Sequence, residues 1–158
     1  MKKFLTIAYW SIFLFYLALL VDTVFVTRDA RRSINLFPFQ MINEHAFSLN
    51  VWGNVVMFIP LGIYVALQLK NFTLKKALSL IVGASLTIEI IQLTFARGAT
   101  DIDDVILNTI GGLIGVLIYI SFKKLFKTRA KVQKAISLLS IIIGIPIILL
   151  VVVLIIAN

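Results

Sequence analysis

The chain has 158 residues, of which 61% are hydrophobic and 14% charged, with a net charge of +8 and a mean hydropathy of +1.06. Globular proteins usually carry about 25% charged residues, so this chain has too few polar side chains to cover a water-facing surface. The composition excludes a disordered protein and predicts an all-α integral membrane helical bundle. Because the sequence lacks cysteine, disulfides, thiolate metal sites and cysteine nucleophiles are excluded.

Five apolar stretches approach or reach the roughly 20 residues that a helix needs to cross a bilayer. The expected helices are Phe4–Val26, Asn50–Leu69, Ala77–Phe95, Asp103–Phe122 and Ala135–Ala157. They form a single membrane domain, 1–158, made of a first span (1–26), an outer connection (27–49), a core of three spans (50–122), a basic cytoplasmic loop (123–134) and a fifth span (135–158). No small-x-small cleavage site follows the first stretch, which indicates an uncleaved anchor.

Basic residues predict the orientation. Eleven of the 15 Lys and Arg residues fall on one side of the five spans, and the other four are Arg28, Arg31, Arg32 and Arg97. The side with eleven is expected to be cytoplasmic, which places the N-terminus inside and the C-terminus outside. The run from Lys123 to Lys134 is expected to attract anionic lipid headgroups. Nucleic acid is not an expected partner, because no base-reading or stacking element accompanies the charge.

Polar side chains in three of the spans are predicted to meet near one level. Asn54 is in the second span, Glu89 and Gln92 share one face of the third with Ser85, and Asn108 lies one turn below Asp104 in the fourth. At about 1.5 Å per residue, Asn54, Asn108 and Glu89 are roughly 6–9 Å below the outer ends of their helices. They therefore predict an outward-facing polar pocket, with Arg97 and the other outer arginines just above it.

Glu89 is the most informative of these residues. An unpaired carboxylate in hydrocarbon costs several kcal/mol, so this side chain must be protonated, paired or open to water. Arg97, about two turns further along, is its expected partner. The alternative is that Glu89 and Gln92 only bond Asn54 and Asn108 to hold the helices together. The functional interpretation is favoured, because packing alone does not require charges of both signs to converge.

The acidic run Asp101, Asp103, Asp104 has two interpretations. Carboxylates in a first helical turn cap the helix, which is expected of Asp101 or Asp103, whereas Asp104 is expected to face Asn108 and the pocket. The spacing matches no calcium-binding loop, so neither a metal nor a cofactor is expected. No nucleophile motif is present, and the single histidine, His45, is interpreted as incidental.

Two further patterns concern packing. Gly111 and Gly115 form a small-x-x-x-small step, on which a neighbouring helix can approach closely or an oligomer can form. The outer connection contains the apolar run Leu36, Phe37 and Phe39. It is interpreted either as an interfacial or re-entrant segment that caps the bundle or as ordinary headgroup anchoring.

In their order and spacing, these residues resemble the VanZ-like membrane proteins. The match runs from Asn35 to Gly115 and comprises Asn35-Leu36-Phe37-Pro38-Phe39, Asn54-x-x-x-Phe58-x-Pro60-Leu61-Gly62, Glu89-x-x-Gln92, Arg97, Asp101-x-Asp103-Asp104 and Asn108-Thr109-x-Gly111-x-x-x-Gly115. The resemblance implies an association with low-level resistance to teicoplanin, a glycopeptide antibiotic that acts outside the membrane. The family positions that match are Asn54, Glu89, Gln92, Arg97, Asp101, Asp104 and Asn108.

The favoured hypothesis is a multi-pass protein of the bacterial plasma membrane whose pocket binds a polar lipid headgroup. Its expected partners are membrane lipids and a lipid-linked wall precursor or a glycopeptide or lipopeptide antibiotic. An enzyme acting on the same headgroup, with Glu89 and Asp104 as acid and base, is the first alternative. A non-catalytic assembly partner that oligomerises through Gly111 and Gly115 is the second.

Overall fold

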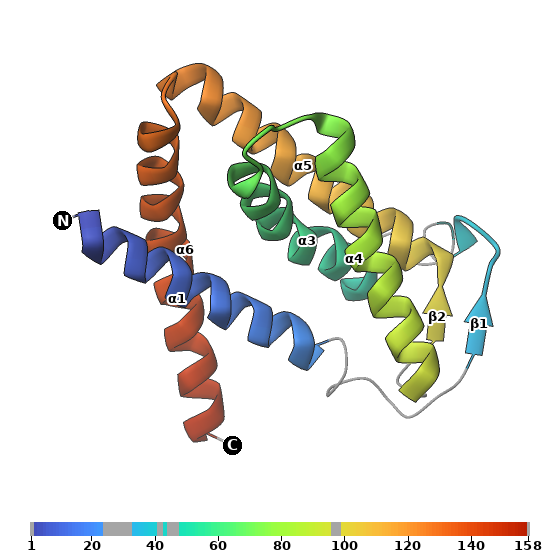
Figure 1. Ribbon diagram of the computed structural model, residues 1–158. Helices are drawn as coiled ribbons and strands as arrows, with labels where there is room; N and C mark the ends of the chain where they lie inside the picture. The colour runs from blue at the N-terminus through green and yellow to red at the C-terminus, as the bar shows by residue number, and fades with distance from the viewer. Residues whose placement is uncertain (1, 24–32, 41–42, 44–47, 96–98, 158) are drawn as a thin grey trace. The chain divides into compact units, whose positions relative to one another are not determined.

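The computed structural model describes residues 2–23, 33–40, 43, 48–95 and 99–157. Within these ranges the elements are α1 (Lys2–Val21), β1 (Ser33–Asn35), α3 (Leu49–Gln68), α4 (Leu74–Phe95), β2 (Ala99–Asp101), α5 (Ile102–Phe126) and α6 (Arg129–Ala157) (Figure 1). The five α-helices of this described part are each long and apolar enough to cross a membrane. An all-α membrane bundle with five spans is thus confirmed.

The chain divides into two compact units, each of which is described by itself. One unit comprises Met1–Leu20 and Phe122–Asn158 and contains α1 and α6. The other comprises Val21–Ser121 and contains α3, α4, both strands and most of α5. All of the predicted polar pocket residues belong to this second unit.

Glycines allow α3 and α5 to pack with their backbones in contact. A Cβ atom on Gly111 would collide with the carbonyl oxygen of Val55, and one on Gly62 would collide with that of Gly112. Gly115 faces the α3 backbone in the same way. The close approach expected on this face of α5 is therefore present, and its partner is the chain's own α3. The oligomer expected through Gly111 and Gly115 stays a prediction.

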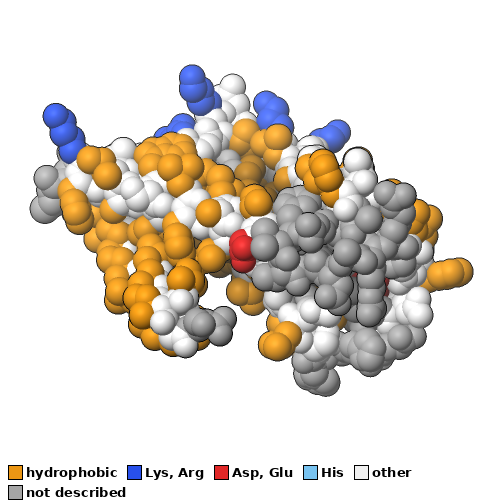
Figure 2. Space-filling view, turned by 90° about the horizontal axis from the view of Figure 1, so that it is seen from below, with side chains coloured by type: hydrophobic (Ala, Val, Ile, Leu, Met, Phe, Trp, Pro, Cys, Tyr) orange, Lys and Arg blue, Asp and Glu red, His pale blue; other side chains and the backbone are white. Residues whose placement is uncertain are grey.

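Large hydrophobic side chains remain exposed along the spans, as the lipid-facing surface of a membrane bundle requires. In α6 the buried residues are confined to Val132, Ile136 and Ser137, near the start of the helix. Side chains further along, such as Ile142 and Leu150, are exposed. Figure 2 shows hydrophobic side chains over much of the face that it presents.

The basic loop predicted at 123–134 is much shorter in the structure. Helix α5 continues to Phe126 and α6 begins at Arg129, which leaves only Lys127 and Thr128 between them. The prediction was wrong because it ended the helices where the apolar residues end, whereas Lys and Arg are themselves good helix formers. The Thr128 hydroxyl accepts a hydrogen bond from the Lys131 amide at 3.4 Å and so caps the first turn of α6.

Helix α1 begins at Lys2, two residues before the predicted start at Phe4, and its α-helical part is described up to Val21. Residues 24–26 lie outside the described ranges.

The structure also contains a short parallel strand pair that the sequence did not predict. Strand β1 pairs with β2, with Ser33 opposite Ala99 and Asn35 opposite Asp101. Figure 1 shows the two arrows side by side next to the start of α5. The pairing matters for the site because it places Asn35 beside the first turn of α5.

Candidate functional site

Six of the seven predicted site residues lie in the described part of the chain, and the structure brings them together around the start of α5. Five of the six are buried: Glu89, Gln92, Asp101, Asp104 and Asn108. Asn54 is half-buried. The seventh, Arg97, lies outside the described residues, as do His45 and the arginines of the outer connection, Arg28, Arg31 and Arg32.

Asp101 caps α5 and also connects it to β1. Its Oδ1 accepts a hydrogen bond from the amide of Asp103 at 2.9 Å, which is the capping role expected of it. Its Oδ2 accepts a second hydrogen bond from Nδ2 of Asn35 at 3.1 Å. The amide of Asp101 in turn donates to Oε2 of Glu89 at 3.2 Å. The intramembrane carboxylate of Glu89 is therefore compensated by a backbone N–H at the start of α5.

Residues 33–40, here called the anchored segment, are held in place by polar side chains. The amide of Phe37 donates to Oδ1 of Asn35 at 3.1 Å, and the amide of Phe39 donates to Oδ1 of Asp103. The apolar side chains of the segment are exposed, and Phe37 is 77% exposed. Leu36 and Phe39 are also exposed. This combination favours the interfacial interpretation of the segment, because its backbone is fixed while its apolar side chains remain available.

Deeper in the unit, two hydrogen bonds join the three helices. Nδ2 of Asn54 on α3 donates to Oδ1 of Asp104 on α5, and Nδ2 of Asn108 donates to Oγ of Ser85 on α4 at 2.9 Å. The alternative interpretation of the sequence had Glu89 and Gln92 as the bonding partners of the two asparagines, and the structure places all four side chains around one cavity. The position of each polar group along its helix axis follows from counting residues. Its hydrogen-bond partner depends instead on how far each helix is rotated about its axis.

A small cavity lies between α3, α4 and α5 at this level. It is lined by Asn54, Met57, Phe58, Ile88, Glu89, Gln92, Asp104 and Asn108, and its volume is about 10 Å³. That is room for about one water molecule. Oδ1 of Asn108 is buried and has no hydrogen-bond donor among the described residues, so a water here would supply one. A lipid headgroup does not fit, and a larger ligand must contact the surface above.

The electrostatics of the site are dominated by four acidic residues near one helix N-terminus. Glu89, Asp101, Asp103 and Asp104 are all buried, and each accepts a hydrogen bond from a backbone or amide N–H. The positive end of the α5 dipole also favours negative charge at this place. In the described ranges, no group of three or more His, Asp or Glu side chains is arranged to hold a metal ion.

Sequence reasoning missed Asn35 as a member of the site. Its sequence signals were that it is a polar residue at the start of the apolar run in the outer connection and that it begins the family-like motif Asn35-Leu36-Phe37-Pro38-Phe39. What places it in the site is the register of the strand pair, which joins residues 66 positions apart.

Comparisons with known proteins agree with the motif arrangement. The sequence pattern of the VanZ/LLP1 family matches residues 4–127. A curated relative, "Protein VanZ" of Enterococcus faecium, is 40% identical over 89 residues, which are 56% of this chain and 53% of that protein. The chain thus spans about half the length of this relative. No solved structure gives a significant match.

Proposed function

The chain belongs to the VanZ/LLP1 family, and on this premise we propose that it binds an amphiphilic ligand of the bacterial cell envelope at the plasma membrane. The ligand class is a lipid-linked wall precursor or a teicoplanin-type lipoglycopeptide. Binding would contribute to glycopeptide resistance or to envelope homeostasis. Family membership and the five helices long enough to span a membrane support a membrane protein linked to glycopeptide resistance. The anchored segment supports an amphiphilic ligand.

The observation that carries this proposal is the combination of fixed backbone and exposed apolar side chains in the anchored segment. An amphiphile at the membrane interface needs an apolar surface for its acyl chain next to polar partners for its head. Leu36, Phe37 and Phe39 provide the apolar surface. Asn54, the least buried of the six described site residues, provides a partly accessible amide.

The residues of the site divide into two roles under this proposal. The buried carboxylates Asp101 and Asp103 position the anchored segment, as their hydrogen bonds to Asn35 and Phe39 indicate. Charge on the ligand is held by Arg97, together with arginines of the outer connection, because guanidinium groups bind phosphate and carboxylate through charge-assisted hydrogen bonds. The predicted orientation puts the start of α5 and the anchored segment on the outer side of the membrane.

An enzyme with Glu89 and Asp104 as acid and base is the second candidate function, since both carboxylates line the same cavity. The size of that cavity favours binding over catalysis. With room for about one water, it does not admit a headgroup between the two carboxylates. A reaction there would require α3, α4 and α5 to separate, against the backbone contact of Gly62 with Gly112.

Replacing Phe37 with serine is expected to weaken teicoplanin binding by about tenfold or more. Burying a Phe side chain contributes about 1.5–3 kcal/mol, and about 1.4 kcal/mol corresponds to tenfold in affinity. Binding is measured on the protein in nanodiscs, with empty nanodiscs subtracted to remove partitioning of the drug into lipid.

The matched control is Leu125→Ser. Leu125 is 72% exposed, comparable to Phe37, but lies at the far end of α5 from the site. This variant is expected to bind teicoplanin like the wild type. Equal affinity of wild type and Phe37→Ser, or an equal loss in both variants, would contradict a binding role for the anchored segment.

A further inference from the structure

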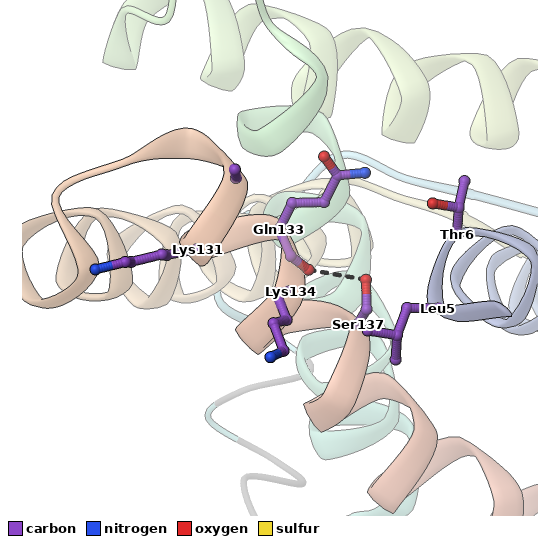
Figure 3. A pocket seen from close by; sticks show the side chains of 7 residues that line it. Leu5, Thr6, Lys131, Gln133, Lys134 and Ser137 are labelled. Atoms are coloured by element: carbon purple, nitrogen blue, oxygen red, sulfur yellow. Dashed lines mark hydrogen bonds between the residues drawn. The ribbon is translucent and has the colours of Figure 1, made fainter. Parts of the chain in front are cut away.

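A second pocket lies between α1 and α6, within the unit that comprises Met1–Leu20 and Phe122–Asn158. Its volume is about 400 Å³, within the roughly 300–1,000 Å³ usual for small-molecule sites. Leu5 and Thr6 line it from α1, and the N-terminal turns of α6 line it from the other side (Figure 3). None of its lining residues belongs to the site described above.

This unit carries the entire net charge of the protein. It contains eight of the 15 basic residues and none of the seven acidic ones, whereas the other unit has seven of each. The unit therefore contains no carboxylate side chain of its own. Four of the cations, Lys127, Arg129, Lys131 and Lys134, fall at the start of α6, where the helix dipole adds further positive potential.

The pocket combines polar groups with an apolar side chain. Figure 3 shows the Gln133 amide and the Thr6 hydroxyl directed toward one another across the gap, while the ammonium group of Lys131 points away from α1. The charge of Lys131 thus lies at the border of the pocket, on a flexible stem. Ser137 is 2% exposed, and its hydroxyl donates to the Gln133 carbonyl at 2.8 Å. Leu5 contributes apolar contact on the α1 side.

We propose that this pocket binds the headgroup of an anionic phospholipid. Basic pockets between transmembrane helices are established sites for anionic lipid headgroups. A lipid is favoured over a soluble anion because both helices continue from the pocket into exposed apolar surface, such as Ile7 on α1 and Ile142 on α6, along which acyl chains pack. The predicted orientation assigns the lipid to the cytoplasmic leaflet.

The test uses Trp10, which lies one helical turn from Thr6 on α1 and is 42% exposed. In a Trp52→Phe background it is the only tryptophan, since the chain has two. The protein is placed in mixed vesicles of phosphatidylglycerol and phosphatidylcholine in which one lipid at a time carries brominated acyl chains. Quenching of Trp10 is expected to be stronger for brominated phosphatidylglycerol at equal mole fraction.

Two variants separate a discrete site from general attraction of a basic surface. Ala130→Leu keeps every charge and adds a good helix former at an exposed position, but it fills part of the pocket. We expect it to reduce the preference for phosphatidylglycerol at least fivefold. The double variant Lys131→Gln, Lys134→Gln is expected to do the same. Its matched control, Lys123→Gln with Lys124→Gln, removes equal charge from α5 outside the pocket and should have a clearly smaller effect.

Three results would overturn the proposal. Full retention of the preference in Ala130→Leu, or equal losses in the two lysine pairs, would mean that the attraction is diffuse. Loss of the preference when excess inorganic phosphate or glycerol phosphate is added would assign the pocket to a free phosphate anion. Equal quenching by the two brominated lipids in the wild type would show that no anionic lipid is selected.

Discussion

The variant Gly111→Ala is expected to lose about 3 kcal/mol of stability, because overpacking of a tight interface typically costs 1–3 kcal/mol and here the obstacle is backbone. The new Cβ atom would collide with the carbonyl oxygen of Val55, which cannot move without shifting α3. For a chain of this size, each kcal/mol lowers the melting temperature by about 2–4 °C, so a decrease of roughly 6–12 °C is expected. Thermal unfolding in detergent, followed by circular dichroism, measures it.

Gly53→Ala is the matched control, since it makes the same change on a helix of the same unit. Nothing lies within 4 Å of a Cβ atom at Gly53. Alanine is favoured over glycine in a helix by about 1 kcal/mol, so this variant should melt at the wild-type temperature or above it. If Gly111→Ala melts like Gly53→Ala, the direct backbone contact between α3 and α5 is incorrect.

The variant Asp101→Ala is expected to release the anchored segment. It removes both the acceptor for the Asn35 amide group and the cap on the Asp103 N–H. The hydrogen bond from Asn35 is the one that joins Asp101 to the segment, and a hydrogen bond to a charged group contributes about 1.5–3 kcal/mol, so local opening of the segment should become roughly 10- to 100-fold more frequent. Hydrogen–deuterium exchange at the amides of Phe37 and Phe39 measures this opening.

Thr100→Val is the control for this experiment. The Thr100 hydroxyl donates only a long 3.4 Å hydrogen bond, to the Glu89 carbonyl, and the residue neighbours Asp101 on β2. Exchange at Phe37 and Phe39 should therefore change little in this variant. Unchanged exchange in Asp101→Ala would show that the Asp101 carboxylate does not hold the segment.

The five spans could be predicted from the sequence because apolar length, a local quantity, decides which segments are able to cross a bilayer. The helical rise also predicted that Asn54, Glu89 and Asn108 meet, and all three line one cavity. The Gly-x-x-x-Gly step likewise predicted a close helix contact, which α3 makes.

Details that depend on the rotation or the long-range pairing of segments could not be predicted. The acceptor of Asn54 is Asp104, and the donor to Glu89 is the Asp101 amide, and neither follows from residue spacing. The strand pair is equally hidden, since three-residue strands carry too little pattern to reveal a partner. The size of the cavity is set by side-chain packing, which no sequence pattern specifies.

These differences change the interpretation of the acidic residues. The sequence suggested ligand contact for Asp101 and Asp104 and a capping role for Asp101 or Asp103, whereas in the structure Asp101 and Asp103 accept hydrogen bonds from the anchored segment. Ligand contact is then assigned to Arg97, Asn54 and the exposed side chains of that segment.

Native mass spectrometry of the gently solubilised protein tests the central claim most directly, with Arg97→Ala beside the wild type. Lys70→Ala serves as the control, because it removes one positive charge from the loop after α3, on the predicted cytoplasmic side. Ala130→Leu is measured as well, because it fills part of the pocket between α1 and α6. A phospholipid mass that is lost in this variant is assigned to that pocket and does not count as the ligand of the site near Arg97. We expect a further lipid-linked or lipoglycopeptide mass to be retained by the wild type and by Lys70→Ala and to be lost in Arg97→Ala. A wild-type protein without such a mass, or equal retention in Arg97→Ala, would contradict the proposed ligand site.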